Sequence, residues 1–373
     1  MVSLVALGLG GCVPRATQLG APTSFAVGRL PVAAIPADVN GDGRPDLILT
    51  RLSNGGSVAV LINAGDGSFR ESMSAVGSGA PSVPCVADLN GDGKLDIAVT
   101  GLAPGGYLSI FFGRGDGSFA EPVQHLVGPT ASSPKAGDFN GDGKVDLAVV
   151  LAQPERSDAS GYLESELVLL FGRGDGGFET GHALQVGRAV TAFAVGDFNG
   201  DHLLDLAFAD RRSVVSIELG NGNGTFRELA PQYVAFQAVG ISSADVNRDG
   251  VLDLVLGVDR GVSVLLGRGD GSFARSGDYV VEQTRSAWAV DLDRDGNVDL
   301  VTAHRILRGD GSGHFSPLAL GHRYNDDSFV AAADFNGDGW PDLATVDVEH
   351  GEVNIYLNHG GPAPVTSGLR SAR

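Results

Sequence analysis

One acidic nine-residue pattern recurs along the chain and constrains the fold more than any other feature. The pattern is Asp-x-Asn/Asp-x-Asp-x-x-x-Asp, and its seven copies start 50, 50, 59, 48, 46 and 43 residues apart. A period of this length predicts a chain built from one repeated structural unit. The copies, called loops one to seven here, span 38–46, 88–96, 138–146, 197–205, 245–253, 291–299 and 334–342.

The residue types in each loop favour a hard divalent cation. Side-chain oxygens at the first, third, fifth and ninth positions and the backbone carbonyl of the seventh are the kind of ligand that Ca²⁺ prefers. Gly43 can adopt the positive φ that the tight turn of loop one needs. An EF-hand would require Glu at the twelfth position, where loop one has Leu49, and helical flanks are missing.

The predicted metal ligands therefore follow from the spacing alone, with up to seven Ca²⁺ ions as the expected cofactor. In chain order they are Asp38, Asn40, Asp42, Arg44 and Asp46; Asp88, Asn90, Asp92, Lys94 and Asp96; Asp138, Asn140, Asp142, Lys144 and Asp146; Asp197, Asn199, Asp201, Leu203 and Asp205; Asp245, Asn247, Asp249, Val251 and Asp253; Asp291, Asp293, Asp295, Asn297 and Asp299; and Asp334, Asn336, Asp338, Trp340 and Asp342.

The seven loops are not expected to bind equally. Loop six has four carboxylates, so it is predicted to bind most tightly if its geometry can hold them. Loop four has His202 where the others have Gly, and positive φ is costly for a residue with a side chain, so impaired occupancy is expected there. The alternative is that the loops are turn-forming clusters without metal. Packing three carboxylates together without a cation is repulsive, which disfavours that alternative.

The loops also explain the charge of the chain. Its formal net charge is −19 over 373 residues, and the loops hold 22 of its 45 acidic side chains. Seven bound Ca²⁺ ions would leave the protein near −5. No basic stripe is present, so nucleic acid is excluded as a partner.

Short apolar runs on both sides of the loops predict strands, for example 32–35, 47–49 and 57–62. A second motif, first seen at Gly65–Phe69, returns after the later loops, and a longer version is predicted from Gly309 to Phe315. Its acidic residues, such as Asp66 and Asp116, are interpreted as turn residues and not as ligands, because Asn223 can replace them.

Four strands per repeat predict an all-β fold, a seven-bladed β-propeller of four-stranded antiparallel blades. The last repeat lacks its fourth strand, and counting back from Asp38 places the missing strand at about residues 19–30, so an N-terminal strand is expected to close the ring. The predicted organisation is a leader at 1–11, a tether at 12–18, the propeller at 19–361 and a disordered tail at 362–373.

The loop at Asp38–Asp46 together with the Gly-Asp-Gly-Ser-Phe motif resembles the FG-GAP, or VCBS, repeat family, whose members include the integrin α propeller and bacterial surface proteins. The resemblance covers nearly the whole chain after the leader. It implies Ca²⁺ between the first two strands of a blade, and adhesion, ligand binding or scaffolding as the function. It also implies that the chain is not an enzyme by itself.

The N-terminus carries the only targeting signal. The apolar stretch before Cys12 resembles a bacterial lipobox, which predicts lipidation of Cys12 and export to the cell envelope; the alternatives are an ordinary secretory leader, which also predicts export, or an unprocessed apolar tail. No other membrane attachment is expected. Cys85 then has no partner, and its apolar neighbours predict a buried strand position.

Three functions remain open from the sequence. The favoured one is a monomeric, Ca²⁺-stabilised module that binds a protein or glycan at the cell surface. A lectin is the second, for which Trp288 and Trp340 are candidate stacking residues, and an insertion at 153–162 is a candidate binding loop. Part of a polysaccharide-degrading machinery is the third, but the scattered His residues form no catalytic pattern.

Overall fold

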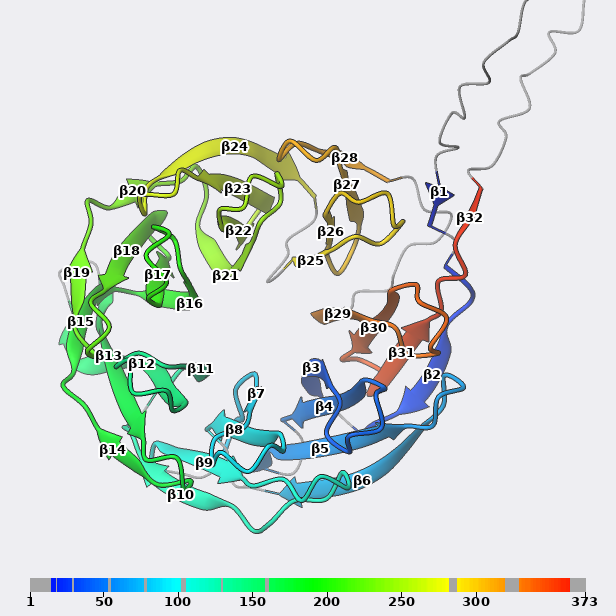
Figure 1. Ribbon diagram of the computed structural model, residues 1–373, viewed down its shortest axis with the longest axis horizontal. Helices are drawn as coiled ribbons and strands as arrows, with labels where there is room; N and C mark the ends of the chain where they lie inside the picture. Colours follow the sequence, from blue (N-terminus) through cyan, green and yellow to red (C-terminus); the bar gives the residue numbers. More distant parts are fainter. Residues whose placement is uncertain are drawn as a thin grey trace, which may run out of the picture.

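Seven antiparallel sheets form a closed ring of blades (Figure 1). The computed structural model describes residues 15–17, 19–28, 30–52, 55–76, 79–101, 105–128, 130–157, 161–281, 287–318 and 329–362. Within these ranges the chain is all-β, as the sequence predicts. None of the described residues forms a helix that could span a membrane.

Blades one to six use their strands in chain order from the centre of the ring outward, and blade seven does so for its three inner strands. The innermost strands are β3 (Pro31–Ala37), β7 (Cys85–Ala87), β11 (Lys135–Gly137), β16 (Val190–Gly196), β21 (Ala238–Ala244), β25 (Trp288–Val290) and β29 (Phe329–Ala333). The second strands are β4 (Asp46–Arg51), β8 (Asp96–Thr100), β12 (Asp146–Ser157), β17 (Asp205–Asp210), β22 (Asp253–Val258), β26 (Asp299–Val301) and β30 (Asp342–Asp347). Every second strand thus begins at the ninth residue of its loop.

The third strands lie beyond them: β5 (Ser57–Asn63), β9 (Tyr107–Phe111), β13 (Leu163–Gly172), β18 (Val214–Gly220), β23 (Gly261–Gly267), β27 (Ile306–Gly309) and β31 (Glu352–Tyr356). The outer strands are β6 (Phe69–Val76), β10 (Val123–Leu126), β14 (Phe178–Thr180) with β15 (Leu184–Arg188), β19 (Phe226–Glu228) with β20 (Gln232–Tyr233), β24 (Phe273–Val280), β28 (Phe315–Pro317) and β2 (Thr23–Ala26). In blades three and four the outer strand is interrupted, and both pieces pair with the same third strand.

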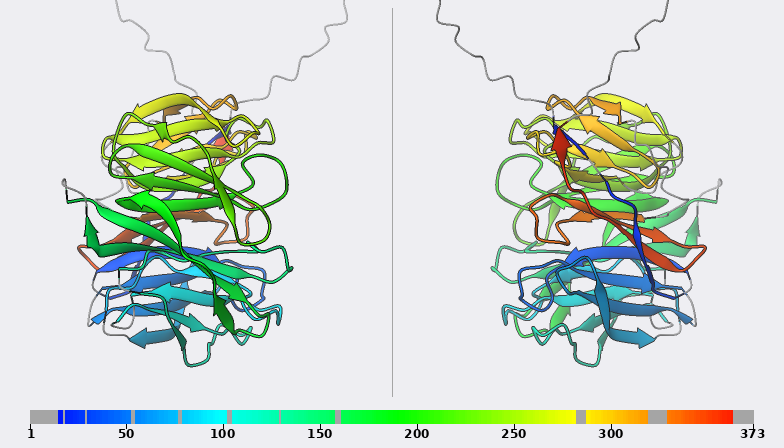
Figure 2. Two further views of the ribbon diagram at one scale, coloured as in Figure 1. Left: turned by 90° about the vertical axis from the view of Figure 1, so that its left-hand side faces the viewer. Right: turned by 90° about the vertical axis from the view of Figure 1, so that its right-hand side faces the viewer.

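The ring closes through the N-terminal strand, as predicted. β2 pairs antiparallel with β31 and completes blade seven, with Thr23 opposite Ile355. A further pair, β1 (Arg15–Ala16) with β32 (Gly361–Pro362), lies beyond this strand and was not predicted; β1 falls in the segment expected to be a tether. The two ends of the described chain therefore lie side by side (Figure 2).

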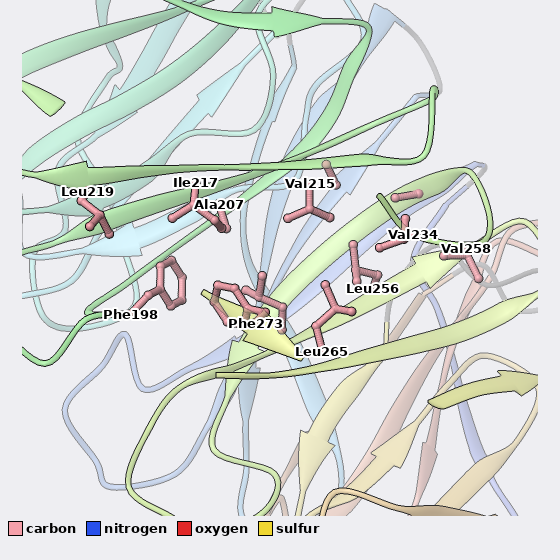
Figure 3. Packing of buried hydrophobic residues seen from close by; sticks show 13 residues of the cluster. Phe198, Ala207, Val215, Ile217, Leu219, Val234, Leu256, Val258, Leu265 and Phe273 are labelled. Carbon is pink, nitrogen blue, oxygen red and sulfur yellow. The ribbon is translucent and has the colours of Figure 1, made fainter. Parts of the chain in front are cut away.

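The core is divided into seven apolar clusters, one between each pair of neighbouring blades. The cluster between blades four and five is an example (Figure 3): Phe198, the second residue of loop four, meets Phe273 of the next blade edge to face, with ring centroids 5.6 Å apart. The Phe that ends each Gly-Asp-Gly motif thus fills the space beneath the preceding loop. Blade-to-blade packing and loop position are set by the same residues.

Two further predictions can be compared with the structure. The insertion that lengthens repeat three extends strands β12 and β13: Gln153 pairs with Glu164, and after a register shift Ser157 pairs with Leu163, while residues 158–160 lie outside the described residues. Cys85 begins β7 and is partly buried; desolvation of the thiol raises its pKa to about 11. The predicted leader and Cys12, most of the tether, and the tail from residue 363 lie outside the described residues.

Candidate metal centres

Each acidic loop joins the innermost strand to the second strand of its blade, so all seven open on one face of the ring. The first Asp shapes the loop. In loop one, Asp38 Oδ1 accepts hydrogen bonds from the amides of Gly41 (2.8 Å) and Asp42 (3.1 Å), and Oδ2 accepts one from Gly43 (2.8 Å). The backbone therefore curls around this carboxylate, and the alternating residues that follow are brought towards it.

The ninth Asp is buried and ties the loop to the blade. Asp46 Oδ2 accepts the Val39 amide at 3.1 Å, and Oδ1 accepts the amide of Asn63, on the third strand, at 2.8 Å. The other six loops repeat both bonds. The expected closure of the metal site by both oxygens must therefore share these oxygens with backbone amides, and each oxygen keeps a lone pair for an ion.

Burial makes the ninth carboxylate costly to ionise when no cation is present. Desolvation, followed by weaker repulsion from Asp42 and Asp38, raises the pKa of Asp46 above its ordinary value. The same causes raise the pKa of Asp342 to about 6. In Asp299 desolvation raises the pKa to about 7, with Asp293 and Asp295 adding repulsion. A divalent cation beside these groups would favour their charged form.

Loop six brings three carboxylates closest together. Oxygens of Asp291, Asp293 and Asp299 all lie within 4.8 Å of one another, and Asp293 and Asp299 are buried. Ca²⁺ binds oxygens at about 2.3–2.6 Å, so ligands of one ion can lie this far apart. The donor set therefore fits a hard divalent cation. In the described part of the chain no other loop brings three carboxylates this close, because Asn stands at their third position.

An arginine next to loop six was missed by the sequence reasoning. Arg308 Nη2 lies 2.8 Å from Asp293 Oδ2 and 2.8 Å from Asp295 Oδ2. The loop with the most carboxylates thus carries its own positive charge, which the expectation of tightest binding did not include. The signal was present in the strand pattern, since Arg308 occupies a position that is apolar in the other blades, such as Ile62 and Leu266.

The remaining predicted ligands follow a common arrangement. The third-position Asn donates to the fifth-position Asp in four loops, for example Asn40 Nδ2 to Asp42 Oδ2 at 3.0 Å. The fifth-position Asp is exposed in every loop. The seventh residue, which contributes only its carbonyl, extends its side chain over a turn glycine of the same blade, as Arg44 does at Gly65.

Three loops place a non-glycine residue in the left-handed region. His202 has φ 68° and its amide donates to Asp197 Oδ2 at 2.8 Å, the same bond that Gly43 makes in loop one. Loop four therefore keeps the loop conformation despite the substitution. Arg248 (φ 66°) and Arg294 (φ 54°) do the same at the fourth position of loops five and six, where the other loops have Gly. These two were not predicted.

The two arginines connect neighbouring loops. Arg248 Nη1 lies 3.3 Å from Asn297 Oδ1 of loop six, and Arg294 stacks over the ring of Trp340 in loop seven, 5.4 Å from the centroid. Trp340 is therefore half-buried beside an arginine, and Trp288 is half-buried on β25. Neither has the full exposure that the sugar-stacking interpretation assumed.

The Gly-Asp-Gly motifs are turns, as predicted. Asp66 Oδ1 accepts the amide of Ser68 at 2.9 Å and its hydroxyl at 2.5 Å, and these bonds lower the pKa of Asp66. The motif in blade six is not longer than the others: Gly309 pairs with Phe315 in the register that joins Asn63 to Phe69. The prediction of a longer motif was wrong because Asp310 lies two positions earlier in its turn than Asp66 does in blade one.

Seven four-stranded blades with an acidic loop on one shared face define a β-propeller with candidate metal loops. The chain belongs to the FG-GAP-like repeat family, whose model matches residues 38–99, 88–149, 197–256, 245–302 and 291–345, more than half of the chain. No curated protein matches it.

Solved structures share the fold. The crystal structure of BBS1N in complex with ARL6DN, soaked with mercury, is similar with a TM-score of 0.61 and 13% identity over 92% of this chain and 97% of that one. An Agrocybe aegerita lectin, solved for its recognition of non-reducing terminal N-acetylglucosamine, has a TM-score of 0.54 and 19% identity over 86% of each chain. At these identities the likeness concerns the fold alone.

Proposed function

We propose that this protein is an exported, Ca²⁺-stabilised propeller that binds another macromolecule at the cell surface. The observation that supports the metal most directly is the convergence of the oxygens of Asp291, Asp293 and Asp299 within 4.8 Å. The residues that would hold the ion in each loop are those at the first, third, fifth and ninth positions, with the seventh carbonyl. A bound Ca²⁺ would neutralise the loops and stabilise their conformation.

The metal part of the proposal is tested by melting and by luminescence. Ca²⁺ should raise the melting temperature and EGTA should reverse the rise, since an ion that binds only the folded state adds about 2.7 kcal/mol per site at a hundredfold excess over its Kd. Tb³⁺ in place of Ca²⁺ should luminesce on excitation of Trp340, which belongs to loop seven, and Trp340→Phe should lower the signal to the part sensitised by Trp288, three residues before loop six. No Ca²⁺-dependent shift in melting would contradict the proposal.

A non-catalytic role is part of the same proposal. Asp310, Ser312 and His314 are the residue types of a nucleophilic triad, and Ser312 Oγ lies 3.1 Å from His314 Nδ1. In a triad the carboxylate orients the histidine ring. Here Asp310 Oδ1 instead accepts the Ser312 hydroxyl at 2.7 Å and the His314 backbone amide at 3.3 Å, so the arrangement is that of a turn.

Carbohydrate binding is the second candidate, since the Agrocybe aegerita lectin has this fold and is described as recognising N-acetylglucosamine. A glycan array probed with the full chain, with and without EGTA, separates the candidates. Ca²⁺-dependent binding to particular glycans would favour a lectin. If no glycan on the array is bound although Ca²⁺ raises the melting temperature, a protein partner is favoured.

A further inference from the structure

We propose that blade six carries a binding pocket for a single sugar ring of a glycan. The pocket deepens the proposed binding function, on which it rests, by naming a place and a ligand class. It lies on the face of the ring that bears the acidic loops, between loop six and the turn that joins β27 to β28.

The pocket is an open cavity of about 370 Å³. Loop six supplies Asp295 and Asn297, and the rest of the wall comes from the end of β27, the turn and the start of β28: Arg308, Gly309, Asp310, His314, Phe315 and Ser316. Ligand pockets in proteins measure about 300–1,000 Å³, so this one is at the small end of the range and suits one ring.

The residues around the cavity can be compared with the equivalent residues of the other blades. In blades one and two the long seventh-position side chains, Arg44 and Lys94, extend over the turn glycine. In blade six the equivalent residue is the short Asn297, which reaches Gly311 and has its Oδ1 held by Arg248 at 3.3 Å. Blades four and five also carry short residues at this position, Leu203 and Val251, so side-chain length alone does not set blade six apart. The polar lining of its cavity does.

Three polar residues of blade six line the cavity at positions where the other blades have different residues. Arg308 stands where the other blades are apolar: Ile62, Phe112, Phe171, Leu219, Leu266 and Leu357. His314 stands where the turns with the same register have a small residue: Ser68, Ser118, Gly177, Thr225 and Ser272. Asp310 is the sole acid at its position, where blade one has Ala64 and blade five has Arg268. All three side chains are changed in one blade and border one cavity.

The chemistry of the lining favours hydroxyl groups over ions. Arg308 lies 2.8 Å from both Asp293 and Asp295. With a Ca²⁺ ion in loop six, the four carboxylates of the loop balance the ion, Arg294 and Arg308 in formal charge, so the site offers hydrogen bonds but little net charge to a phosphate or carboxylate. Asp310 is exposed and lines the pocket, and its hydrogen bonds within the described chain all go to Oδ1, so Oδ2 remains as an acceptor for a ligand.

The lining thus offers both donors and acceptors. The Asn297 amide and the imidazole of His314 can donate, while the Asp310 carboxylate and the Ser316 hydroxyl can accept. Neighbouring hydroxyls of a sugar each donate and accept, and they match such a mixed set. An apolar ligand would leave these groups unpaired, which is costly.

The test uses the full chain with saturating Ca²⁺ and a panel of free monosaccharides: glucose, galactose, mannose and N-acetylglucosamine. Saturation-transfer NMR reports which sugar binds. The blade-six variant Asp310→Ala/His314→Ser restores the residues of blade one. The control Arg268→Ala/Ser272→Gly changes the same two turn positions in blade five, again to residues that other blades carry.

The expected result is binding of at least one sugar, at least tenfold weaker in the blade-six variant and unchanged in the control. Equal binding of a sugar by both variants would overturn the proposed pocket. So would a Ca²⁺-stabilised protein that binds none of the four sugars. Either result would leave the proposed binding function standing. A missing Ca²⁺ shift in melting would instead count against the proposed function. His314→Ser alone, on an exposed side chain, provides a folded variant if the double variant fails to fold.

Discussion

Arg308 and Asp293 form an ion pair that is unique to blade six, with Arg308 Nη2 2.8 Å from Asp293 Oδ2. In blade one the same two positions hold Ile62 and Asn40. The acid and the base thus occur together in blade six, where the positive charge of Arg308 offsets the additional negative charge of Asp293. Asp293 is 3% exposed, so its charge depends on a partner.

This pairing predicts a strong coupling in a double-mutant cycle. Arg308→Leu alone should destabilise the Ca²⁺-free protein by about 1–3 kcal/mol, because it leaves a buried carboxylate without its cation. Asp293→Asn/Arg308→Leu, which recreates the pair of blade one, should recover most of that loss. Urea unfolding in EGTA measures both. Additive effects of the two single changes would show that the residues do not act as a pair.

The two acidic positions of loop one should respond differently to neutralisation. Asp46→Asn should cost about 1–3 kcal/mol even in EGTA, because one of its two buried backbone bonds is replaced by an unfavourable donor–donor contact. Asp42→Asn should cost less than about 0.5 kcal/mol in EGTA, since Asp42 is exposed and its ion-pair partner, the half-buried Arg44, is still open to solvent. In Ca²⁺ both variants should lose stability, because each replaces a charged carboxylate ligand with a neutral amide oxygen. Equal behaviour of the two in EGTA would contradict the structural role of Asp46.

Relieving the backbone strain in loop four should stabilise the protein. His202 has φ 68°, which glycine adopts without a steric penalty, so His202→Gly should gain about 0.5–1 kcal/mol after the flexibility that glycine adds to the unfolded chain is subtracted. The matched control is Gly43→His at the same position of loop one, which should lose a similar amount. Urea unfolding of the two variants and the parent protein measures both changes in the free energy of unfolding. A loss of stability in His202→Gly would mean that the imidazole contributes more than its conformation costs.

Glu218 predicts a pH dependence that is separate from the metal loops. It is buried opposite Glu228 on the neighbouring strand, and desolvation together with repulsion from Glu228 raises its pKa from 4.5 to about 7. The folded state therefore holds this proton between about pH 4.5 and pH 7 while the unfolded state releases it. Stability from this group falls as pH rises through that window, and the whole penalty is present above pH 7.

Glu218→Gln should remove this penalty. Relative to the parent protein its free energy of unfolding should be nearly unchanged at pH 4.5 and about 2–3 kcal/mol higher at pH 8. Denaturant unfolding across this range gives the difference, in which the metal-dependent terms cancel. Glu228→Gln, on an exposed partner, is the control and should have a smaller effect. A difference that does not grow with pH would mean that Glu218 is already ionised at low pH.

Much of the architecture could be predicted from the sequence because the chain is built from a repeat. Each loop carries its own turn residues, such as Asp38 and Gly43, so local chemistry and period agree on the number of blades. Ring closure could be inferred because the final repeat lacks an outer strand. The β1–β32 pair could not be inferred, since two residues on each side carry no periodic signal.

The contacts that distinguish one loop from another were harder to predict from the sequence. Asp293 is visible as an extra acid, but its partner Arg308 lies on another strand and becomes meaningful only when the register of blade six is known. Arg248 and Arg294 are exposed, and the spacing of their own loops gives them no predicted role. Each contacts the following loop, a relation between repeats that spacing within one repeat does not contain.

The meeting of β1 with β32 has a topological consequence. A closed ring of similar blades whose ends adjoin has no structurally required starting point, so the covalent break could be moved to another inter-strand hairpin. Joining residues 15 and 362 by a short linker and opening the long β12–β13 hairpin would leave the pairing of every blade intact. Because both ends of the described chain leave at the junction of blades six and seven, anything fused to either end would be held at that one point on the circumference.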